Sequence, residues 1–185
     1  MNDLRYPTGK FEWIPPDDEA QMAKRRVHYI EVLSKLPGQM RVAVRDLSAV
    51  QLDTPYRPQG WSVRQVVHHV PDSHLNAYIR FKLALTEDVP SIKPYHENLW
   101  AELPDNAITP VEVSLQLLAA LHSRWVDLLK AMKPADFART LNHPERGVLS
   151  LDQMLAMNAW HSAHHLTHIT ALRERMRWEQ RAAAG

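Results

Sequence analysis

Apolar residues recur at intervals of three and four along four long segments of the chain, the spacing of an amphipathic α-helix. The predicted helices span about residues 18–47, 62–87, 109–132 and 150–178. Ser62, Thr109 and Ser150 each precede a Gln or Glu by three residues, so each matches the capping box that starts a helix. The alternation of apolar and polar residues that is typical of strands is not prominent. The pattern therefore predicts an all-α four-helix bundle.

Prolines inside two of the predicted helices, and connections of unequal length, predict departures from a simple four-helix bundle. Pro37-Gly38 interrupts the first segment, which predicts either a kinked long helix or two pieces placed end to end. Pro71 predicts a bend in the second helix. The Pro-rich segment 88–109 is longer than antiparallel neighbours need, so we expect a long crossover loop that packs onto the bundle. Residues 137–149 are compatible with a small hairpin.

The length of 185 residues suits one domain, 1–185, with a single sizeable core. Residues 1–17 read as an arm that lies on this domain, and residues 179–185 as a flexible tail. No apolar stretch approaches the roughly 20 residues that span a bilayer, so no membrane association is expected. The first residues also lack the apolar segment of a signal peptide. A cytoplasmic location is the resulting expectation.

Charge and cysteine content narrow the possible partners. The chain has 22 basic and 21 acidic residues and a formal net charge of +1, which gives no electrostatic reason to expect nucleic acid as a partner. It has no cysteine, which excludes disulfides, cysteine-zinc sites and a cysteine nucleophile. Any metal ion must therefore be held by His, Asp or Glu.

Histidine is concentrated near the end of the chain, where residues 159–168 hold four of the eleven histidines. His161 with His165, and His164 with His168, are pairs four residues apart, and such a pair on one helix face can bind one metal ion. The apolar face of this helix lies nearer to His161 and His165, so the pattern favours them as the inward pair. The margin of His161 over His168 is narrow.

A second group of histidines, His68, His69 and His74, lies about ninety residues upstream. His74 falls on the apolar face of its helix, which suits either a core histidine or a metal ligand. His69 falls on a polar stripe, which suits either a solvated position or the lining of a pocket. The pattern alone does not decide between His69 and His74.

Several motifs together resemble the DinB/YfiT-like superfamily. They include the segment Gly60-Trp-Ser-Val-Arg-Gln-Val-Val-His-His69 with its continuation to residue 82, and Trp160-His-Ser-Ala-His-His-Leu-Thr-His168. Residues 93–95 and 121–125 add to the resemblance. It implies an up-down-down-up four-helix bundle, a homodimer and one divalent metal ion, zinc or nickel. The implied ligands are His69, His161 and His165, while Pro71 stands where the family usually has Ala. His68, His164 and His168 are then expected to be outer-shell or surface residues.

The resemblance implies two kinds of activity. Some members look like transferases that join a low-molecular-weight thiol, such as bacillithiol or mycothiol, to an electrophilic small-molecule substrate, and others carry the name of metal-dependent hydrolases. A metal-bound thiolate is expected in the first case and a metal-bound hydroxide in the second. We favour the transferase; the hydrolase and a non-catalytic metal-binding bundle are the alternatives. A fourth ligand, such as His74 or Asp72, would favour the last.

Three further residues are candidates for the chemistry. Asp72 lies one turn from His69 and is placed to orient an imidazole or to accept a proton, although a solvated carboxylate is an equal alternative. Arg80 and Arg124 are candidates to bind a carboxylate on the thiol, and each has an ordinary ion pair as its alternative.

Overall fold

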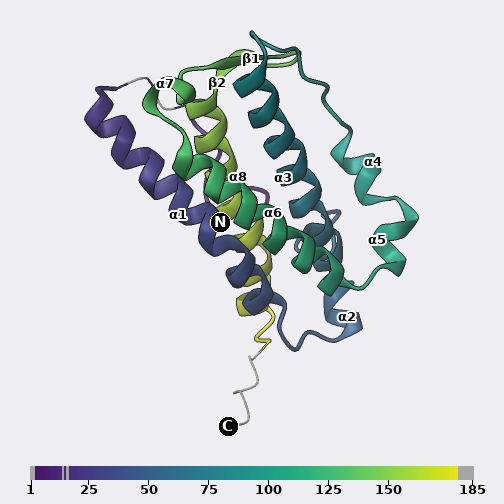
Figure 1. Ribbon diagram of the computed structural model, residues 1–185. Helices are drawn as coiled ribbons and strands as arrows, with labels where there is room; N and C mark the ends of the chain where they lie inside the picture. The colour runs from purple at the N-terminus through teal and green to yellow at the C-terminus, as the bar shows by residue number, and fades with distance from the viewer. Residues whose placement is uncertain (1–2, 14, 16, 179–185) are drawn as a thin grey trace.

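The computed structural model of the protein describes residues 3–13, 15 and 17–178. Within them, four long helices form a bundle: α1 (Glu19–Val44), α3 (Val63–Thr86), α6 (Val111–Ala131) and α8 (Leu151–Arg175). Figure 1 shows α3 and α6 running in one direction and α1 and α8 in the other. An ion pair of 2.7 Å between Arg26 and Asp152 joins the starts of α1 and α8. The predicted up-down-down-up four-helix bundle is confirmed.

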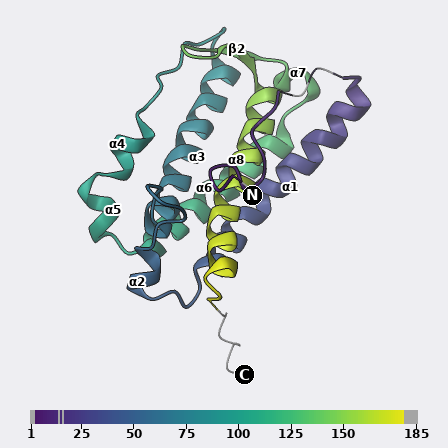
Figure 2. The same ribbon diagram turned by 180° about the vertical axis from the view of Figure 1, so that it is seen from behind.

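The parallel pair α3 and α6 requires the chain to return from one end of the bundle to the other. Figure 2 shows this return segment running along the outside of the bundle beside α3. It contains two short helices, α4 (Glu97–Ala101) and α5 (Pro104–Ile108), and both contact α3. Gln65 Nε2 donates a hydrogen bond of 2.9 Å to the carbonyl of Ala101. The crossover is therefore ordered and packed, as the sequence predicted.

A small hairpin closes one end of the bundle. Strand β1 (Thr140–His143) follows the short helix α7 (Pro134–Phe137) and pairs antiparallel with β2 (Gly147–Ser150). Gly147 has a φ of 72°, a conformation that favours glycine at the turn. The amide of Ile92 donates to the carbonyl of Asn142, so the crossover begins against this hairpin.

The predicted capping boxes are correct in two of three cases. Ser62 and Ser150 each form a capping box, with Gln65 and Gln153 respectively. The predicted box at Thr109 is wrong, because the Thr109 amide donates to the carbonyl of Asp105 and closes α5 instead. Pro110 is the N-cap of α6 and has no side-chain acceptor for the helix amides. The short helix α2 (Ala49–Leu52), which follows α1, was not predicted.

Both prolines inside long helices are accommodated. A single helix, α1, continues through Pro37, so the alternative of two separate pieces is wrong. Pro71 lies within α3 and is buried. None of the helices in the described ranges has the combination of length and apolar character that crossing a bilayer requires.

The apolar core consists of two clusters stacked along the bundle axis, and each receives residues from all four long helices. On α3, the first cluster ends at Val70 and the second begins at Ala77, so His74 lies between them. On α8, one cluster ends at Leu155 and the other begins at Ile169, and the histidines 161–168 lie between them. The imidazoles thus occupy a polar layer that divides the core.

The N-terminal arm, residues 3–13, lies against α8. Trp160 Nε1 donates a hydrogen bond of 3.1 Å to the carbonyl of Gly9, and His168 Nε2 lies 3.3 Å from the carbonyl of Arg5. His164 is 8% exposed and His168 is 3% exposed, so of the two alternatives, outer-shell or surface, the surface position is wrong for both. His68 is buried as well. The predicted tail, 179–185, lies outside the described residues.

Candidate metal centre

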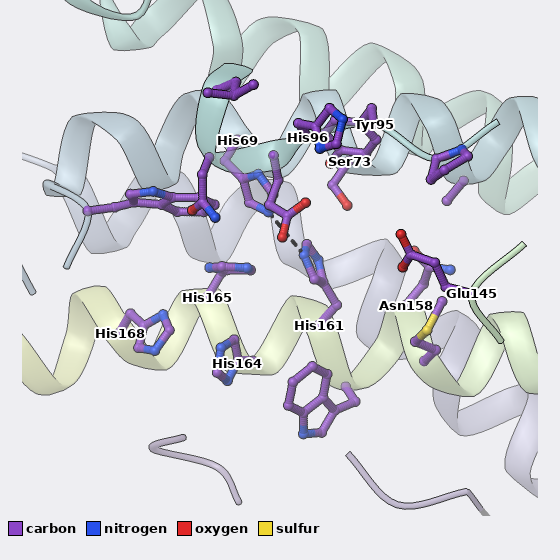
Figure 3. Close-up of a pocket in the computed structure, with 18 of the residues that line it drawn as sticks. His69, Ser73, Tyr95, His96, Glu145, Asn158, His161, His164, His165 and His168 are labelled. Carbon is purple, nitrogen blue, oxygen red and sulfur yellow. Dashed lines mark hydrogen bonds between the residues drawn. The ribbon is translucent and has the colours of Figure 1, made fainter. Parts of the chain in front are cut away.

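Three imidazoles from two helices converge at one side of the polar layer. His69 belongs to α3, and His161 and His165 belong to α8, which packs against α3 (Figure 3). One nitrogen of each ring lies within 4.8 Å of the others, and the Nε2 atoms of His69 and His161 are 3.2 Å apart. These are the three ligands that the resemblance implied, so helix packing brings distant parts of the sequence to one point.

The regular geometry of α8 places two of these rings together. Residues four apart lie on one helix face, and the ring centroids of His161 and His165 are 4.4 Å apart. Ser150 sets the start of this helix through its capping box. The inward orientation that the periodicity favoured for this pair is the one observed.

Burial keeps the three rings neutral. It lowers the pKa of His69 to about 3, with a smaller contribution from the nearby His164. Burial also lowers the pKa of His161 and His165 well below the usual range, and neighbouring histidines add to the effect. Neutral imidazole is the form that binds a metal ion, and three such nitrogens suit zinc, nickel or copper. The residues present therefore fit a divalent metal ion.

Another possible metal-binding group, made of three histidines of α8, lies beside His69, His161 and His165. His164, His165 and His168 also have one nitrogen each within 4.8 Å of one another, and all three come from α8. Their Nδ1 atoms are buried without a hydrogen-bond partner among the described residues. His165 belongs to both groups. The group that contains His69 differs because it joins two helices.

His74 lies behind the proposed ligands. Its Nε2 is 3.1 Å from Nδ1 of His161, and its Nδ1 is 2.8 Å from Nε2 of His122. Both of its ring nitrogens are therefore engaged by other imidazoles, and the His161 atom that it contacts is not the one near His69. His74 therefore does not take the position of a fourth metal ligand, which the sequence analysis had left open. His122, on α6, had no predicted role, since its only signal was a place in one of the motifs.

The convergent rings line a cavity of about 760 Å³. The cavity wall also includes polar residues of α3 and of two other segments: Ser73 and Arg80 of α3, Tyr95, His96 and Glu97 of the crossover, and His143, Glu145 and Arg146 of the hairpin. Figure 3 shows Glu145 and Asn158 on the side of His161, and Tyr95 and His96 near Ser73. The crossover and the hairpin thus contribute polar groups that the sequence analysis did not single out.

Of the three further candidates, Arg80, Arg124 and Asp72, only Arg80 is among the described residues that line the cavity. Arg80 lines the cavity, and its Nη2 donates to the carbonyl of Lys93 at 3.1 Å. Arg124 is exposed and lies 5.9 Å from the ring centre of Tyr78. Neither Arg124 nor Asp72 is among the described residues that line the cavity.

The Asp72 carboxyl is half-buried. Burial raises its pKa to about 6, with a smaller contribution from the negative charge of Asp105. Asp72 is not in the group of described residues that His69, His161 and His165 form. Glu145 is a carboxylate that the cavity does contain.

Comparisons with known proteins give relatives that match along almost the whole chain. A curated relative from Bacillus mycoides is 53% identical over 178 residues, which cover 96% of this chain and 100% of the relative. A relative from Bacillus cereus is 52% identical over the same shares of both chains. Both carry the name "putative metal-dependent hydrolase".

Solved structures show the same architecture. YfiT from Bacillus subtilis, described as a probable metal-dependent hydrolase with an unusual four-helix bundle topology, matches with a TM-score of 0.88 and 44% identity. The match covers 95% of this chain and 99% of YfiT. TT2238, a four-helix bundle protein, matches with a TM-score of 0.51 and 20% identity over 82% of this chain and 98% of its own, and is similar in fold alone. The model of the DinB superfamily matches residues 33–169, and the chain belongs to this superfamily.

Proposed function

We propose that the protein is a metal-dependent enzyme that transfers a low-molecular-weight thiol to an electrophilic small molecule. The observation that carries this proposal is the convergence of His69, His161 and His165 on a cavity of about 760 Å³. We propose that they hold one divalent ion, zinc or nickel, per chain. Such an ion lowers the pKa of a thiol or water that binds to it, so that a nucleophile forms near neutral pH.

The cavity residues then have distinct roles. Three neutral imidazoles leave the positive charge of the ion uncompensated, which favours ionisation of the thiol. Glu145 is a candidate to accept the thiol proton, because it is, like Glu97, a carboxylate on the cavity wall. The sulfur then forms a bond to carbon, and the leaving group departs with the bonding electrons. Arg80 is a candidate to bind an anionic group of the thiol or the electrophile, since it lines the same cavity.

Hydrolysis is the second candidate, and the names of the relatives favour it. It uses the same three ligands, with water in place of the thiol and Glu145 as the candidate proton acceptor. A non-catalytic metal site is less well supported, because structural zinc normally has four protein ligands. His74 bonds to the back of His161, and Asp72 is not among the described cavity residues, so neither supplies an evident fourth ligand.

Thiol-dependent activity is the expected result of a direct assay. The metal-loaded protein is supplied with a haloarene or monobromobimane, with and without bacillithiol, mycothiol, glutathione or cysteine, and with a parallel panel of esters and amides. We expect conjugation that requires one of the thiols and is lost after chelation or in His69→Ala. His28→Ala is the matched control, because His28 is exposed on α1 and should leave the activity unchanged. Hydrolysis without any thiol, sensitive to the same changes, would assign the second function instead.

We also propose a homodimer. Exposed apolar side chains on α4, α5 and the first part of α6 support it, among them Leu99, Ile108 and Val113. Light scattering at micromolar concentration is expected to give twice the mass of the chain. A monomer mass under these conditions contradicts the proposal.

A further inference from the structure

A chain of hydrogen bonds crosses all four long helices through the polar layer. It begins at the carbonyl of Leu33 on α1, which is 2.6 Å from Nδ1 of His122 on α6. His122 Nε2 is 2.8 Å from Nδ1 of His74 on α3. His74 Nε2 is 3.1 Å from Nδ1 of His161 on α8. The chain thus ends at one of the proposed metal ligands.

The backbone carbonyl determines the direction of every bond in this chain. A carbonyl oxygen can only accept, so Nδ1 of His122 carries the hydrogen. A neutral imidazole has one N–H, so Nε2 of His122 accepts from Nδ1–H of His74. By the same rule, Nε2 of His74 accepts from Nδ1–H of His161. His161 is then left with a lone pair on Nε2, the nitrogen that lies 3.2 Å from His69.

The opposite direction is disfavoured. It would place the lone pair of His122 Nδ1 against the lone pairs of the Leu33 oxygen at 2.6 Å, with no bond between them. His74 is 0% exposed and His122 is 2% exposed, so solvent cannot compensate either group. No carboxylate of the described residues hydrogen-bonds to these rings, which agrees with neutral imidazoles throughout.

We propose that His74 and His122 are positioning residues that hold His161 in the Nδ1–H tautomer, with Nε2 aimed at the metal ion. This inference rests on the proposed metal site. The chain ends at a carbonyl, which does not take up a proton, so it acts by orientation and not by carrying protons to solvent. His122 acts on the site through two hydrogen bonds and touches none of the proposed ligands directly.

Two substitutions at His122 separate this role from packing. In His122→Phe a ring still stacks on His74, where the present ring centroids are 5.0 Å apart, but the acceptor for His74 is lost. In His122→Gln the ring is lost, but the side-chain amide oxygen can accept from His74. We expect His122→Phe to weaken zinc binding about 10–100-fold, as removal of such outer partners typically does, and His122→Gln to stay within about threefold of wild type. A packing role predicts the reverse order.

Zinc affinity is measured by competition with a chromogenic chelator, and circular dichroism checks that each variant is folded. The tautomers are read from long-range ¹H–¹⁵N correlations of the imidazole rings in metal-free protein. We expect the Nδ1–H form for His161, His74 and His122 in wild type. In His122→Phe we expect His161 to shift toward the Nε2–H form.

The outcomes distinguish this inference from the proposed function. An Nε2–H form of His161 in wild type overturns the inference, and so does equal zinc affinity of wild type and a folded His122→Phe. If His122→Phe does not fold, the wild-type spectrum and the affinity of His122→Gln decide. If wild type binds no zinc or nickel, the proposed function fails, whereas the tautomer measurement still tests the hydrogen-bond chain.

Discussion

Substitution of His161 by alanine is expected to remove divalent metal from the protein. Structural zinc sites bind with roughly 10–16 kcal/mol, so each of their four ligands contributes roughly 3 kcal/mol, or about two orders of magnitude in affinity. His161 is one of three proposed ligands, and its side chain is also the last member of the hydrogen-bond chain that runs through His74. Elemental analysis of protein purified without a metal-affinity tag, together with chelator competition, measures the loss.

His164→Ala is the matched control for this experiment. His164 lies on the same helix within one turn of His161, but it belongs only to the group His164, His165 and His168. We expect His164→Ala to retain one metal ion per chain. Loss of metal in His164→Ala with full occupancy in His161→Ala would show that the second group, His164, His165 and His168, is the site.

Acidification below about pH 6 is expected to unfold the metal-free protein, because many histidines are buried in neutral form. Burial lowers the pKa of His69 to about 3 and that of His122 to about 4. The unfolded chain protonates these residues near pH 6.5, so it binds more protons than the folded protein between the two values. Stability is present above this range and is lost as the pH falls.

The expected size of this effect is large compared with the stability of a typical domain. Near pH 5 each such histidine changes the free energy of unfolding by about 1.4 kcal/mol per pH unit, so His69 and His122 together change it by about 3 kcal/mol for each pH unit. The whole stability of most domains is about 5–15 kcal/mol. Burial lowers the pKa of further histidines in the same layer, which adds to the loss: His74, His161 and His165. Asp72 opposes this loss of stability on acidification, because burial raises its pKa to about 6 in the folded protein, which therefore binds the Asp72 proton more readily than the unfolded chain does. It is one group against several histidines.

Urea unfolding of chelator-treated protein at several pH values between 7.5 and about 4.5 tests this prediction. We expect the urea midpoint to fall steeply below about pH 6, and the slope with urea to stay constant. A free energy of unfolding that is unchanged between pH 7 and about pH 5 would contradict the neutral, buried state of these imidazoles. Zinc added in excess is expected to move the loss to lower pH, since it binds only the deprotonated ligands.

Local sequence signals predicted the long helices well. Ser62 and Ser150 set the starts of α3 and α8 through bonds to residues three positions away, so the information is contained in four consecutive residues. The same signal failed at Thr109, because α5 ends at this residue and uses its amide. A short helix precedes this motif because the crossover packs on α3. Four consecutive residues of the sequence contain no information about that packing.

The candidate site was predictable only in part, for a similar reason. Spacing on one helix brought His161 and His165 to one face, but His69 joins them through the packing of α3 on α8, and only the resemblance indicated this residue. Periodicity placed His164 far from the apolar face, yet it is buried because the N-terminal arm covers that side of α8. Apart from its place in one of the motifs, His122 gave no signal of its role, since one of its partners is the backbone of Leu33.

The contact between the N-terminal arm and α8 has a consequence for how this segment can vary among relatives. Both acceptors in the arm, at Arg5 and Gly9, are main-chain oxygens, which every residue type provides. Only Gly9, with a φ of 83°, is also restricted in residue type. An insertion or deletion between these positions would displace one acceptor from its fixed donor on the helix, Trp160 or His168. Evolution is therefore expected to preserve the number of residues between positions 5 and 9 more strictly than their side chains.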